Sequence, residues 1–379
     1  MTLRKAASSL AWGLCRLLPL QSNKVVFSSY GGKGFGGNPK AVALALLETG
    51  ADLDLVWLTK TPEASLPDGI RPCKFGSPQA VRELSTAKVW VDDSRGGAHY
   101  KRKSQSYMQT WHGFALKHIE RAAEAHLPAS YIAQCKADSA RTDLIVSNSA
   151  FMTGVYRNDF WYDGEIAAFG SPRNDIFFRD NTALFGQVRR FFGLPGKQKL
   201  LLYAPTFRAD GSTAAYALDA EAALRACEAR FGGKWTALIR LHPNAAALSA
   251  GLFSYDGKRI IDATAYPDMQ ELLVAVDLLI TDYSSSMFDY ALQEKPCIQF
   301  ALDIEDYKND RNFYFPLDML PFPLAMNNVQ LCTCISVFDA EAQRQTWNRF
   351  AQEQDFCEDG HAAERCAQWI LSRMKGTNT

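Results

Sequence analysis

The 379-residue sequence lacks an excess of charge of either sign, since Lys and Arg together number 41 and Asp and Glu also number 41. A chain without net charge creates no overall field that would attract nucleic acid, so we expect no nucleic-acid partner and only local anion sites. The sequence also lacks an apolar run of the roughly 20 residues that a membrane-spanning helix needs. Hydrophobic residues still make up 47% of the chain, which is typical of a well-packed globular protein.

Several motifs of common enzyme classes are absent as well. There is no Gly-x-Ser-x-Gly elbow, no Walker loop and no His-Glu-x-x-His helix, which excludes the commonest hydrolases, ATPases and zinc proteases. The glycines of "SSYGGKGFGGNPKA" (28–41) do not follow the Gly-x-Gly-x-x-Gly spacing of a nicotinamide site. We interpret them as residues that let the backbone approach an acceptor closely.

Cysteine pairs with metal-binding spacing are missing too. The nine cysteines are scattered, and Cys332 and Cys334 form a Cys-x-Cys without a second pair at zinc spacing. A reduced, cytosolic chain is therefore expected. The sequence requires no cofactor, and a loosely held magnesium ion stays an open alternative.

The first 22 residues, "MTLRKAASSLAWGLCRLLPLQS", mix basic residues with leucines. Arg16 interrupts the apolar stretch and no small-residue cleavage site follows, which argues against a signal peptide. We predict an amphipathic helix over 1–22 that lies on a membrane surface. A helix that simply packs on the first domain is an equally good alternative.

Short apolar runs alternate with helical patterns along the rest of the chain. Such runs are typical of parallel strands in sheets that are covered by helices on both faces. The expected strands are 25–29, 53–59, 89–92, 108–111, 144–147 and 166–169 in the first half, and 200–204, 237–241, 260–263, 278–281 and 297–300 in the second.

A Leu-Pro-Gly break at 194–196 separates the two sets of strands. We therefore predict an α/β protein with two doubly wound, Rossmann-like domains, at 23–190 and 191–340, that face each other across a cleft. A long helical segment is expected from about 339 to 375. The C-terminal helices of residues 341–379 would pack back on the first domain.

A serine-rich turn is the strongest single feature of the second half. In "LLITDYSSSMFDYAL" (278–292), an expected strand runs into Ser284, Ser285 and Ser286, where a helix begins. Ser286 and Asp289 have the spacing of a capping box. Because one helix cap needs only one serine, we favour a phosphate site at the helix N-terminus, with capping as a second role.

Two other expected strands of the second half are followed at once by groups that suit anions. Thr206 and Arg208 follow one strand, and Arg240 and His242 follow the other. Arginine presents a fixed fork to phosphate oxygens, and a histidine donates one more hydrogen bond. Satisfied loop residues are the alternative for each loop taken alone.

"SYMQTWHGFALKHI" (106–119) places Trp111, His112 and Gly113 where an expected strand gives way to a helix. Such junctions line the ligand crevice of open α/β sheets. A structural histidine that bonds a neighbouring carbonyl is the alternative for His112. Arg173 also follows an expected strand, and an Arg173–Asp175 pair that holds its own loop is the alternative there.

Seven segments in order resemble the CDP-glycerol glycerophosphotransferase family, the teichoic-acid and capsule enzymes of bacteria. They are "FSSYGGKGFGGNPKA", "QTWHGFALK", "VSNSAF", "GSPRNDIFF", "YAPTFR", "RLHP" and "LLITDYSSSMFDYALQEKPCIQF". The resemblance covers about residues 25–316. It implies a GT-B architecture in which the second domain binds most of the donor.

The resemblance also implies a set of donor contacts. They carry over to Trp111, His112, Gly113, Phe114, Ala115, Arg173, Pro205, Thr206, Arg240, Leu241, His242, Ser284, Ser285 and Asp289. Two departures put the acceptor or the alditol in question. Phe114-Ala115 replaces the Thr-Pro that often follows Trp-His-Gly in the family. The family also tends to end this region with Arg-Gly-Phe-Tyr-Phe-Asp, where this chain has Arg-Asn-Phe-Tyr-Phe-Pro at 311–316.

The implied reaction moves glycerol phosphate from CDP-glycerol to a hydroxyl of a lipid-linked saccharide or a growing polyol-phosphate chain and releases CMP. Imidazole has a reference pKa of about 6.5, so much of it is an available base at neutral pH. We therefore assign His112 as the base that takes the acceptor's proton. Arg240, His242 and the serine turn would stabilise charge on the phosphoryl group. The expected location is the cytoplasmic face of the cell membrane, as a peripheral protein.

Three alternatives stay open. CDP-ribitol could replace CDP-glycerol as the donor, or the chain could be a GT-B glycosyltransferase that uses a nucleotide sugar. A non-catalytic protein that binds a nucleotide or a polymer is the third.

Overall fold

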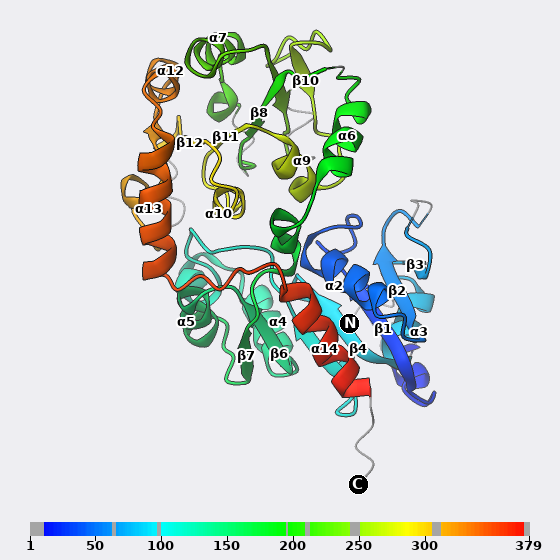
Figure 1. Cartoon of the computed structure of the whole chain (residues 1–379). Coiled ribbons are helices and arrows are strands. Elements are labelled where there is room, and N and C mark those ends of the chain that lie inside the picture. Colours follow the sequence, from blue (N-terminus) through cyan, green and yellow to red (C-terminus); the bar gives the residue numbers. More distant parts are fainter. Residues whose placement is uncertain are drawn as a thin grey trace. The chain divides into compact units, whose positions relative to one another are not determined.

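The computed structural model describes residues 11–62, 66–96, 100–194, 196–208, 213–242, 251–304 and 312–374. Contacts between residues divide the chain into two units. Unit 1 comprises Met1–His112, Ile119–Phe178 and Asp355–Thr379, and unit 2 comprises Gly113–His118 and Arg179–Gln354. Each unit contains one parallel sheet flanked by helices (Figure 1).

The sheet of unit 1 has seven strands in the order β3-β2-β1-β4-β5-β6-β7, and every pairing is parallel. The apolar runs form strands here because a parallel sheet covered on both faces buries both sets of side chains. The strands are β1 (Gln21–Ser28), β2 (Asp54–Thr59), β3 (Ile70–Lys74), β4 (Ala87–Asp92), β5 (Ser106–Gln109), β6 (Leu144–Ser147) and β7 (Glu165–Ala168).

Different elements cover the two faces of this sheet. On one face, α2 (Gly37–Glu48) and α14 (Ala362–Met374) lie side by side over a core that includes Phe27 (Figure 1). On the other face, α3 (Pro78–Thr86) and Trp12 pack with Val26. Neighbouring residues of β1 therefore enter different cores, as the two-residue period of a strand requires. The other helices of unit 1 are η2 (Glu120–His126), α4 (Ala129–Ser139), α5 (Ala150–Asp159) and η3 (Pro172–Phe178).

Unit 2 has a six-stranded parallel sheet in the order β10-β9-β8-β11-β12-β13. Its strands are β8 (Lys199–Ala204), β9 (Trp235–Ile239), β10 (Ile260–Asp262), β11 (Leu278–Thr281), β12 (Cys297–Phe300) and β13 (Leu324–Ala325). Its described helices are α6 (Thr182–Phe191), η4 (Ala214–Tyr216), α7 (Ala220–Phe231), α9 (Met269–Ala275), α10 (Ser286–Ala291), η5 (Leu317–Met319), α12 (Asn328–Ser336) and α13 (Ala340–Glu353).

Every expected strand has a counterpart in the two sheets, and two observed strands were not expected. One of these, β3, contains Pro72 and lies at the edge of its sheet, where a residue without an N–H is tolerated. The other, β13, is only two residues long. Strand β5 ends at Gln109 and does not reach Trp111, because the φ angle of Trp111 is 50°, in the left-handed region that a strand cannot use.

The helical segment expected near the C-terminus consists of two helices that belong to different units. Helix α13 ends at Glu353 and α14 begins at Ala362. Between them the backbone of Asp355 and Gly360 is left-handed, with φ angles of 52° and 82°. A Cβ at Gly360 would come within 2.6 Å of the Phe178 side chain, so this turn requires glycine. Helix α13 is part of unit 2, whereas α14 is part of unit 1.

The helix expected over 1–22 is not confirmed. Residues 1–10 lie outside the described residues, residues 11–15 are helical, and β1 already begins at Gln21. Trp12 is buried and stacks on Tyr100 with ring centroids 4.4 Å apart. Leu14 and Leu17 are 60% and 82% exposed, so this short helix has one packed side and one apolar exposed side.

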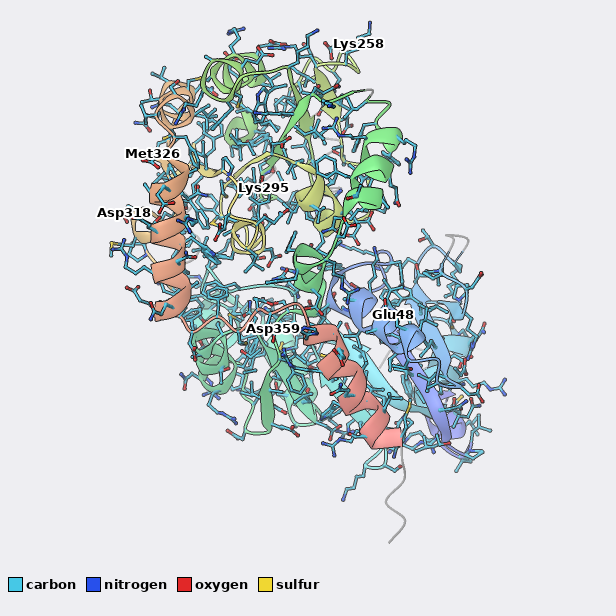
Figure 2. The ribbon with its side chains drawn as sticks, viewed as in Figure 1. Glu48, Lys258, Lys295, Asp318, Met326 and Asp359 are labelled. Atoms are coloured by element: carbon cyan, nitrogen blue, oxygen red, sulfur yellow. The ribbon has the colours of Figure 1, made fainter. Side chains whose placement is uncertain are left out.

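Most charged side chains lie on the outside of the units, as Glu48, Lys258 and Asp359 do (Figure 2). Lys295 is an exception in unit 2. Its ammonium donates to the carbonyl oxygens of Val274 and Val276 at 2.8 and 3.0 Å, between α9 and β11. Burial lowers the pKa of this ammonium.

Among the described residues, no helix has the length and apolar character needed to cross a membrane. The nine cysteines all lie in described segments and are free thiols.

The start of α14 yields a stability prediction. The Asp175 carboxylate accepts from the backbone N–H groups of Ala362 and Ala363 at 3.0 and 2.7 Å. Asp175→Ala should lower the free energy of unfolding by about 1–2 kcal/mol, because the first turn of α14 loses its acceptors. Urea unfolding measures this change. Glu364→Ala, an exposed change in the same turn, is the control, and equal effects of the two variants would contradict the assignment.

Candidate active site

Each sheet has a point where the strand order reverses, and most of the predicted site residues follow strands at or next to it. In unit 1 the reversal falls between β1 and β4, and in unit 2 it falls between β8 and β11. Loops at the carboxyl ends of strands diverge at such a point, which is where open α/β sheets bind ligands.

His112 follows β5 and is held from several sides. Its Nδ1 lies 2.7 Å from the backbone oxygen of Asp93, the first residue after β4. The imidazole stacks on the Trp111 ring with centroids 4.2 Å apart, and the Tyr30 ring lies 6.0 Å away. Arg173 donates to the carbonyl oxygen of His112 at 2.7 Å.

This geometry selects the tautomer of His112. A carbonyl oxygen only accepts, so Nδ1 must carry the proton that it donates to Asp93. In the neutral ring, Nε2 is then the nitrogen with the free lone pair. Burial lowers the pKa of His112, with the Asp93 charge opposing it. The ring is therefore neutral at pH 7, with Nε2 able to accept a proton.

Asp93 also organises the glycine-rich loop after β1. Its carboxylate accepts from the Ser29 hydroxyl at 2.6 Å and from the Tyr30 backbone N–H at 2.7 Å. A Cβ at Gly37 would lie 3.0 Å from the Asp93 carboxylate and 3.1 Å from the Ser29 hydroxyl, and the φ angle of Gly37 is 65°. Glycine at 37 thus lets this loop close over Asp93.

Asn38 and Arg173 connect this loop to the histidine. The Asn38 amide donates to the backbone oxygens of Thr110 and Trp111 at 3.0 and 2.9 Å, and its oxygen accepts from the Arg173 N–H at 3.0 Å. The Asp175 carboxylate accepts from the first two N–H groups of α14, and the Arg173 guanidinium reaches the carbonyl oxygen of His112.

Glu358, between α13 and α14, fixes two more loops of unit 1. One carboxylate oxygen accepts from the amides of Asn148 and Asn174 at 3.1 and 3.0 Å. The other accepts from the Ser171 N–H at 2.9 Å. The C-terminal segment therefore holds the segment that carries Arg173.

In unit 2, the three predicted anion loops follow the adjacent strands β9, β8 and β11, as expected. The Thr206 N–H donates to Asp282 at 2.8 Å, which joins the loop after β8 to the loop after β11. The Thr206 hydroxyl oxygen is buried and has no hydrogen-bond partner among the described residues. Pro205 precedes it directly at the end of β8.

Contact of Arg208 with a phosphate stays a prediction, and the structure shows its guanidinium bonded to protein groups. All three guanidinium nitrogens are engaged, because Nε and Nη2 donate to Asp303 at 2.6 and 2.9 Å, Nη2 also donates to Asp282 at 2.8 Å, and Nη1 donates to the Thr206 oxygen at 2.6 Å. The guanidinium thus already forms ion pairs with two carboxylates. The arrangement favours a structural role, in which Arg208 holds the loops after β8 and β11 together.

The loop after β9 carries Arg240, Leu241 and His242. Arg240 is half-buried and donates to the backbone oxygen of Tyr266. Leu241 is buried, and its N–H donates to the Thr264 hydroxyl at 3.2 Å. His242 is exposed, with its ring centroid 5.2 Å from that of Phe207. Of the three, His242 presents its side chain most openly to solvent.

The serine turn begins α10, but the expected capping box is wrong. Ser285 is the N-cap residue and makes no side-chain cap bond, while Asp289 accepts from Gln270 at 2.9 Å. The hydroxyls of Ser284 and Ser286 lie 2.9 Å apart and bond each other. The Ser284 hydroxyl also accepts from the Ser286 N–H at 3.3 Å, and Ser284 and Ser285 are both half-buried.

Phe114 and Ala115 belong to unit 2 and are buried. The Phe114 ring packs on Phe288 at 4.5 Å and on Phe315 at 5.9 Å between centroids. Side-chain contact of Phe114 with a ligand stays a prediction, and its observed environment is a core. Among the described residues, no cluster of three or more His, Cys, Asp or Glu side chains is arranged to hold a metal ion.

The chain was compared with known proteins. A family model described as CDP-Glycerol:Poly(glycerophosphate) glycerophosphotransferase matches residues 11–372. The chain belongs to this family. A teichoic acid poly(glycerol phosphate) polymerase of Staphylococcus epidermidis is 30% identical over 370 residues, which are 93% of this chain and 51% of that protein. The chain thus spans about half the length of this relative.

Two further members match over their whole length. A teichoic acid glycerol-phosphate transferase of Staphylococcus aureus is 29% identical, with 98% of this chain and 99% of that protein covered. A solved structure of a variant of the wall teichoic acid polymerase TagF, soaked with CDPG, matches with a TM-score of 0.83 and 26% identity, covering 99% of each chain. The predicted GT-B fold of two Rossmann-like domains is confirmed by this match.

Several residues that shape the site of this family member were not found from the sequence. They are Asn38, Asp93, Asp282, Asp303 and Glu358. Asp93 and Asp282 each come directly after an expected strand, as the predicted residues do, so their positions gave a usable signal. Asn38, Asp303 and Glu358 carried no such signal.

Proposed function

We propose that the protein transfers glycerol phosphate from CDP-glycerol to a hydroxyl group of an acceptor and releases CMP, in the synthesis of a teichoic-acid-like or capsule polymer. The observation that carries the proposal is the bond between His112 and the Asp93 carbonyl, which leaves Nε2 as an unprotonated base. Membership of the family supports the donor, as does the similarity to a TagF structure soaked with CDPG.

His112 acts as the general base in this proposal. The acceptor hydroxyl loses its proton to Nε2 while its oxygen forms a bond to the β-phosphorus of the donor. The bond between that phosphorus and the oxygen of CMP breaks, and CMP leaves with the electron pair. The low pKa of His112 keeps the base unprotonated at neutral pH, and Gly113 leaves room beside it for the acceptor.

Unit 2 binds the diphosphate in this proposal. Arg240, His242, and the hydroxyls and N–H groups of the serine turn would donate to the phosphoryl and CMP oxygens as negative charge grows on them. The Thr206 hydroxyl, which has no hydrogen-bond partner within the described part of the chain, is a further donor for a ligand at the same edge of the sheet. Arg208 supports this site indirectly, through Asp282.

The acceptor in this proposal is a lipid-linked saccharide or a growing polyol-phosphate chain, and the protein works as a peripheral protein at the cytoplasmic face of the membrane. The exposed Leu14 and Leu17 support contact with a lipid surface, because large apolar side chains gain free energy by leaving water. CDP-ribitol is the alternative donor, and parallel assays with the two donors separate them.

Replacement of the proposed base gives the first test. His112→Ala should lower the rate of CMP release from CDP-glycerol by about 10²–10⁴-fold, the usual contribution of a general base. In the wild type, kcat/KM should fall as the pH drops through the lowered pKa of His112, so the acid limb lies below pH 6.5. His126→Ala, an exposed histidine of unit 1, is the control. Wild-type turnover by His112→Ala eliminates the assignment.

A second test concerns the donor. His242→Ala should weaken binding of CDP-glycerol about tenfold, since one hydrogen bond to a charged group is lost. Calorimetric titration with CDP-glycerol measures the Kd. His361→Ala, which removes an exposed histidine of unit 1, should leave it unchanged. An unaltered Kd for His242→Ala contradicts the phosphate role.

The third test addresses the membrane. Leu14→Ser combined with Leu17→Ser should reduce binding to anionic vesicles at least about tenfold, because two exposed leucines no longer insert. The buried Trp12 stays in place, so the fold of unit 1 is not disturbed. Val329→Ser with Val337→Ser, at two exposed apolar positions of unit 2, is the matched control. Vesicle binding that persists in the leucine variant excludes this helix as the contact.

A further inference from the structure

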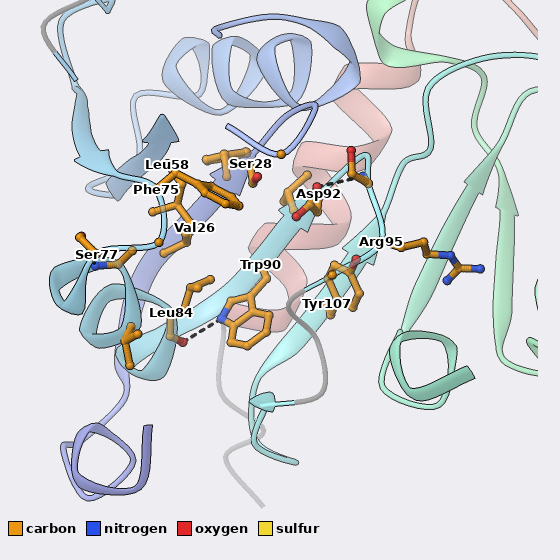
Figure 3. A pocket seen from close by; sticks show the side chains of 18 of the residues that line it. Val26, Ser28, Leu58, Phe75, Ser77, Leu84, Trp90, Asp92, Arg95 and Tyr107 are labelled. Carbon is orange, nitrogen blue, oxygen red and sulfur yellow. Dashed lines mark hydrogen bonds between the residues drawn. The ribbon is translucent and has the colours of Figure 1, made fainter. Parts of the chain in front are cut away.

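Unit 1 contains a cavity of about 420 Å³ on the face of its sheet that α3 covers (Figure 3). This volume is within the range of about 300–1,000 Å³ that is usual for small-molecule sites. The cavity is separate from the groups assigned to donor and base. Its walls come from β1, β2, β4 and β5, from α3, and from Trp12.

Most of the cavity wall is apolar. Val26, Leu58 and Trp90 form part of the sheet side, and Val81 and Leu84 of α3 face them. The Trp90 indole N–H donates to the Leu84 carbonyl at 2.8 Å, so the ring is fixed and its polar atom is satisfied (Figure 3). An apolar chamber of this kind suits a hydrocarbon chain.

One end of the cavity is polar. Ser28 and Asp92 are paired in the register of β1 and β4, and both line the cavity (Figure 3). Ser28 is 5% exposed, and its hydroxyl oxygen has no hydrogen-bond partner among the described residues. A buried hydroxyl without a partner loses free energy that a bound hydrogen-bonding group would restore.

The charges around this end select an uncharged head group. Asp92 accepts from the Ser94 N–H at 2.9 Å. Desolvation and the neighbouring charge of Asp93 raise the pKa of its carboxyl well above the usual range, and in either protonation state its oxygens accept from a hydroxyl. Arg95 is the positively charged residue among those that line the cavity. Its Nη1 lies 2.8 Å from the Asp138 carboxylate and its Nε lies 3.8 Å from the Glu120 carboxylate. An anionic head would therefore find no uncompensated cation among the described lining residues.

We propose that this cavity binds a single-chain amphiphile with an uncharged hydroxyl head, such as a fatty alcohol or a monoacylglycerol. The hydrocarbon chain lies along Val26, Trp90 and Val81, and the hydroxyl bonds Ser28 and Asp92. Trp12 lines the cavity and is two residues from the exposed Leu14, so the cavity wall adjoins the segment that is proposed to contact lipid.

Calorimetric titration of the full chain with 1-octanol and with octyl phosphate tests the proposal. 1-Octanol should bind with a measurable Kd, and octyl phosphate should bind at least about tenfold more weakly, because it brings a charge without a partner. Absence of 1-octanol binding overturns the site. Equal binding of the two probes overturns the role of the uncharged head.

Three variants test whether 1-octanol binds in this cavity. Val81→Phe fills the cavity and should weaken 1-octanol binding about tenfold, equivalent to losing the burial of about two methylene groups. Gln79→Phe places the same ring on the exposed side of α3 and should leave the Kd unchanged. Ser28→Ala removes only the hydroxyl and should weaken 1-octanol binding about fivefold, with no change in octane binding. Unchanged 1-octanol binding by both Val81→Phe and Ser28→Ala places the ligand elsewhere and overturns the proposal.

Discussion

The geometry of the candidate base depends on Asp93, a residue with no solvent exposure that comes directly after β4. Its carboxylate accepts three hydrogen bonds, from the Ser29 hydroxyl, the Tyr30 N–H and the Ser94 hydroxyl. Its backbone carbonyl accepts a hydrogen bond from Nδ1 of His112. A buried carboxylate needs several donors to offset its lost hydration, and here the donors are the loop residues themselves. Asp93 therefore both holds the loop and fixes the tautomer of His112.

In unit 2 the corresponding residue is Asp282, which comes directly after β11 and also holds a neighbouring loop. Its carboxylate accepts from the N–H groups of Thr206 and Tyr283 and from Arg208. In each unit the aspartate follows the strand on one side of the reversal point and binds the loop from the other side. Where two loops diverge, their backbone N–H groups lack sheet partners, and a carboxylate satisfies them. The similarity of the two units thus extends from the sheets to the residues that close their loops.

Most of the fold was predictable because parallel strands covered on both faces require apolar runs, and a run such as Leu278–Thr281 shows one directly. Strand β3 was missed because Pro72 and its charged neighbours resemble a loop, although an edge position accepts them. In the site, the types of residue that follow the strands could be read from the sequence. The hydrogen-bond partners of those residues could not. Asn148 and Glu358 are 210 residues apart, and Arg208 and Asp303 are 95 apart, so the sequence could not show that Arg208 is already neutralised.

Backbone strain beside His112 shows how firmly the ring is placed. Tyr30 and Trp111 have φ angles of 46° and 50°, a conformation that costs a non-glycine residue about 1–3 kcal/mol. Such residues persist only where their surroundings fix them. Gln109 binds the Trp111 N–H at 2.9 Å, Asn38 binds its carbonyl, and Asp93 binds the Tyr30 N–H. These bonds fix the backbone beside both rings, and they hold the imidazole in place for its proposed role. A preorganised base is what a proton transfer at neutral pH requires.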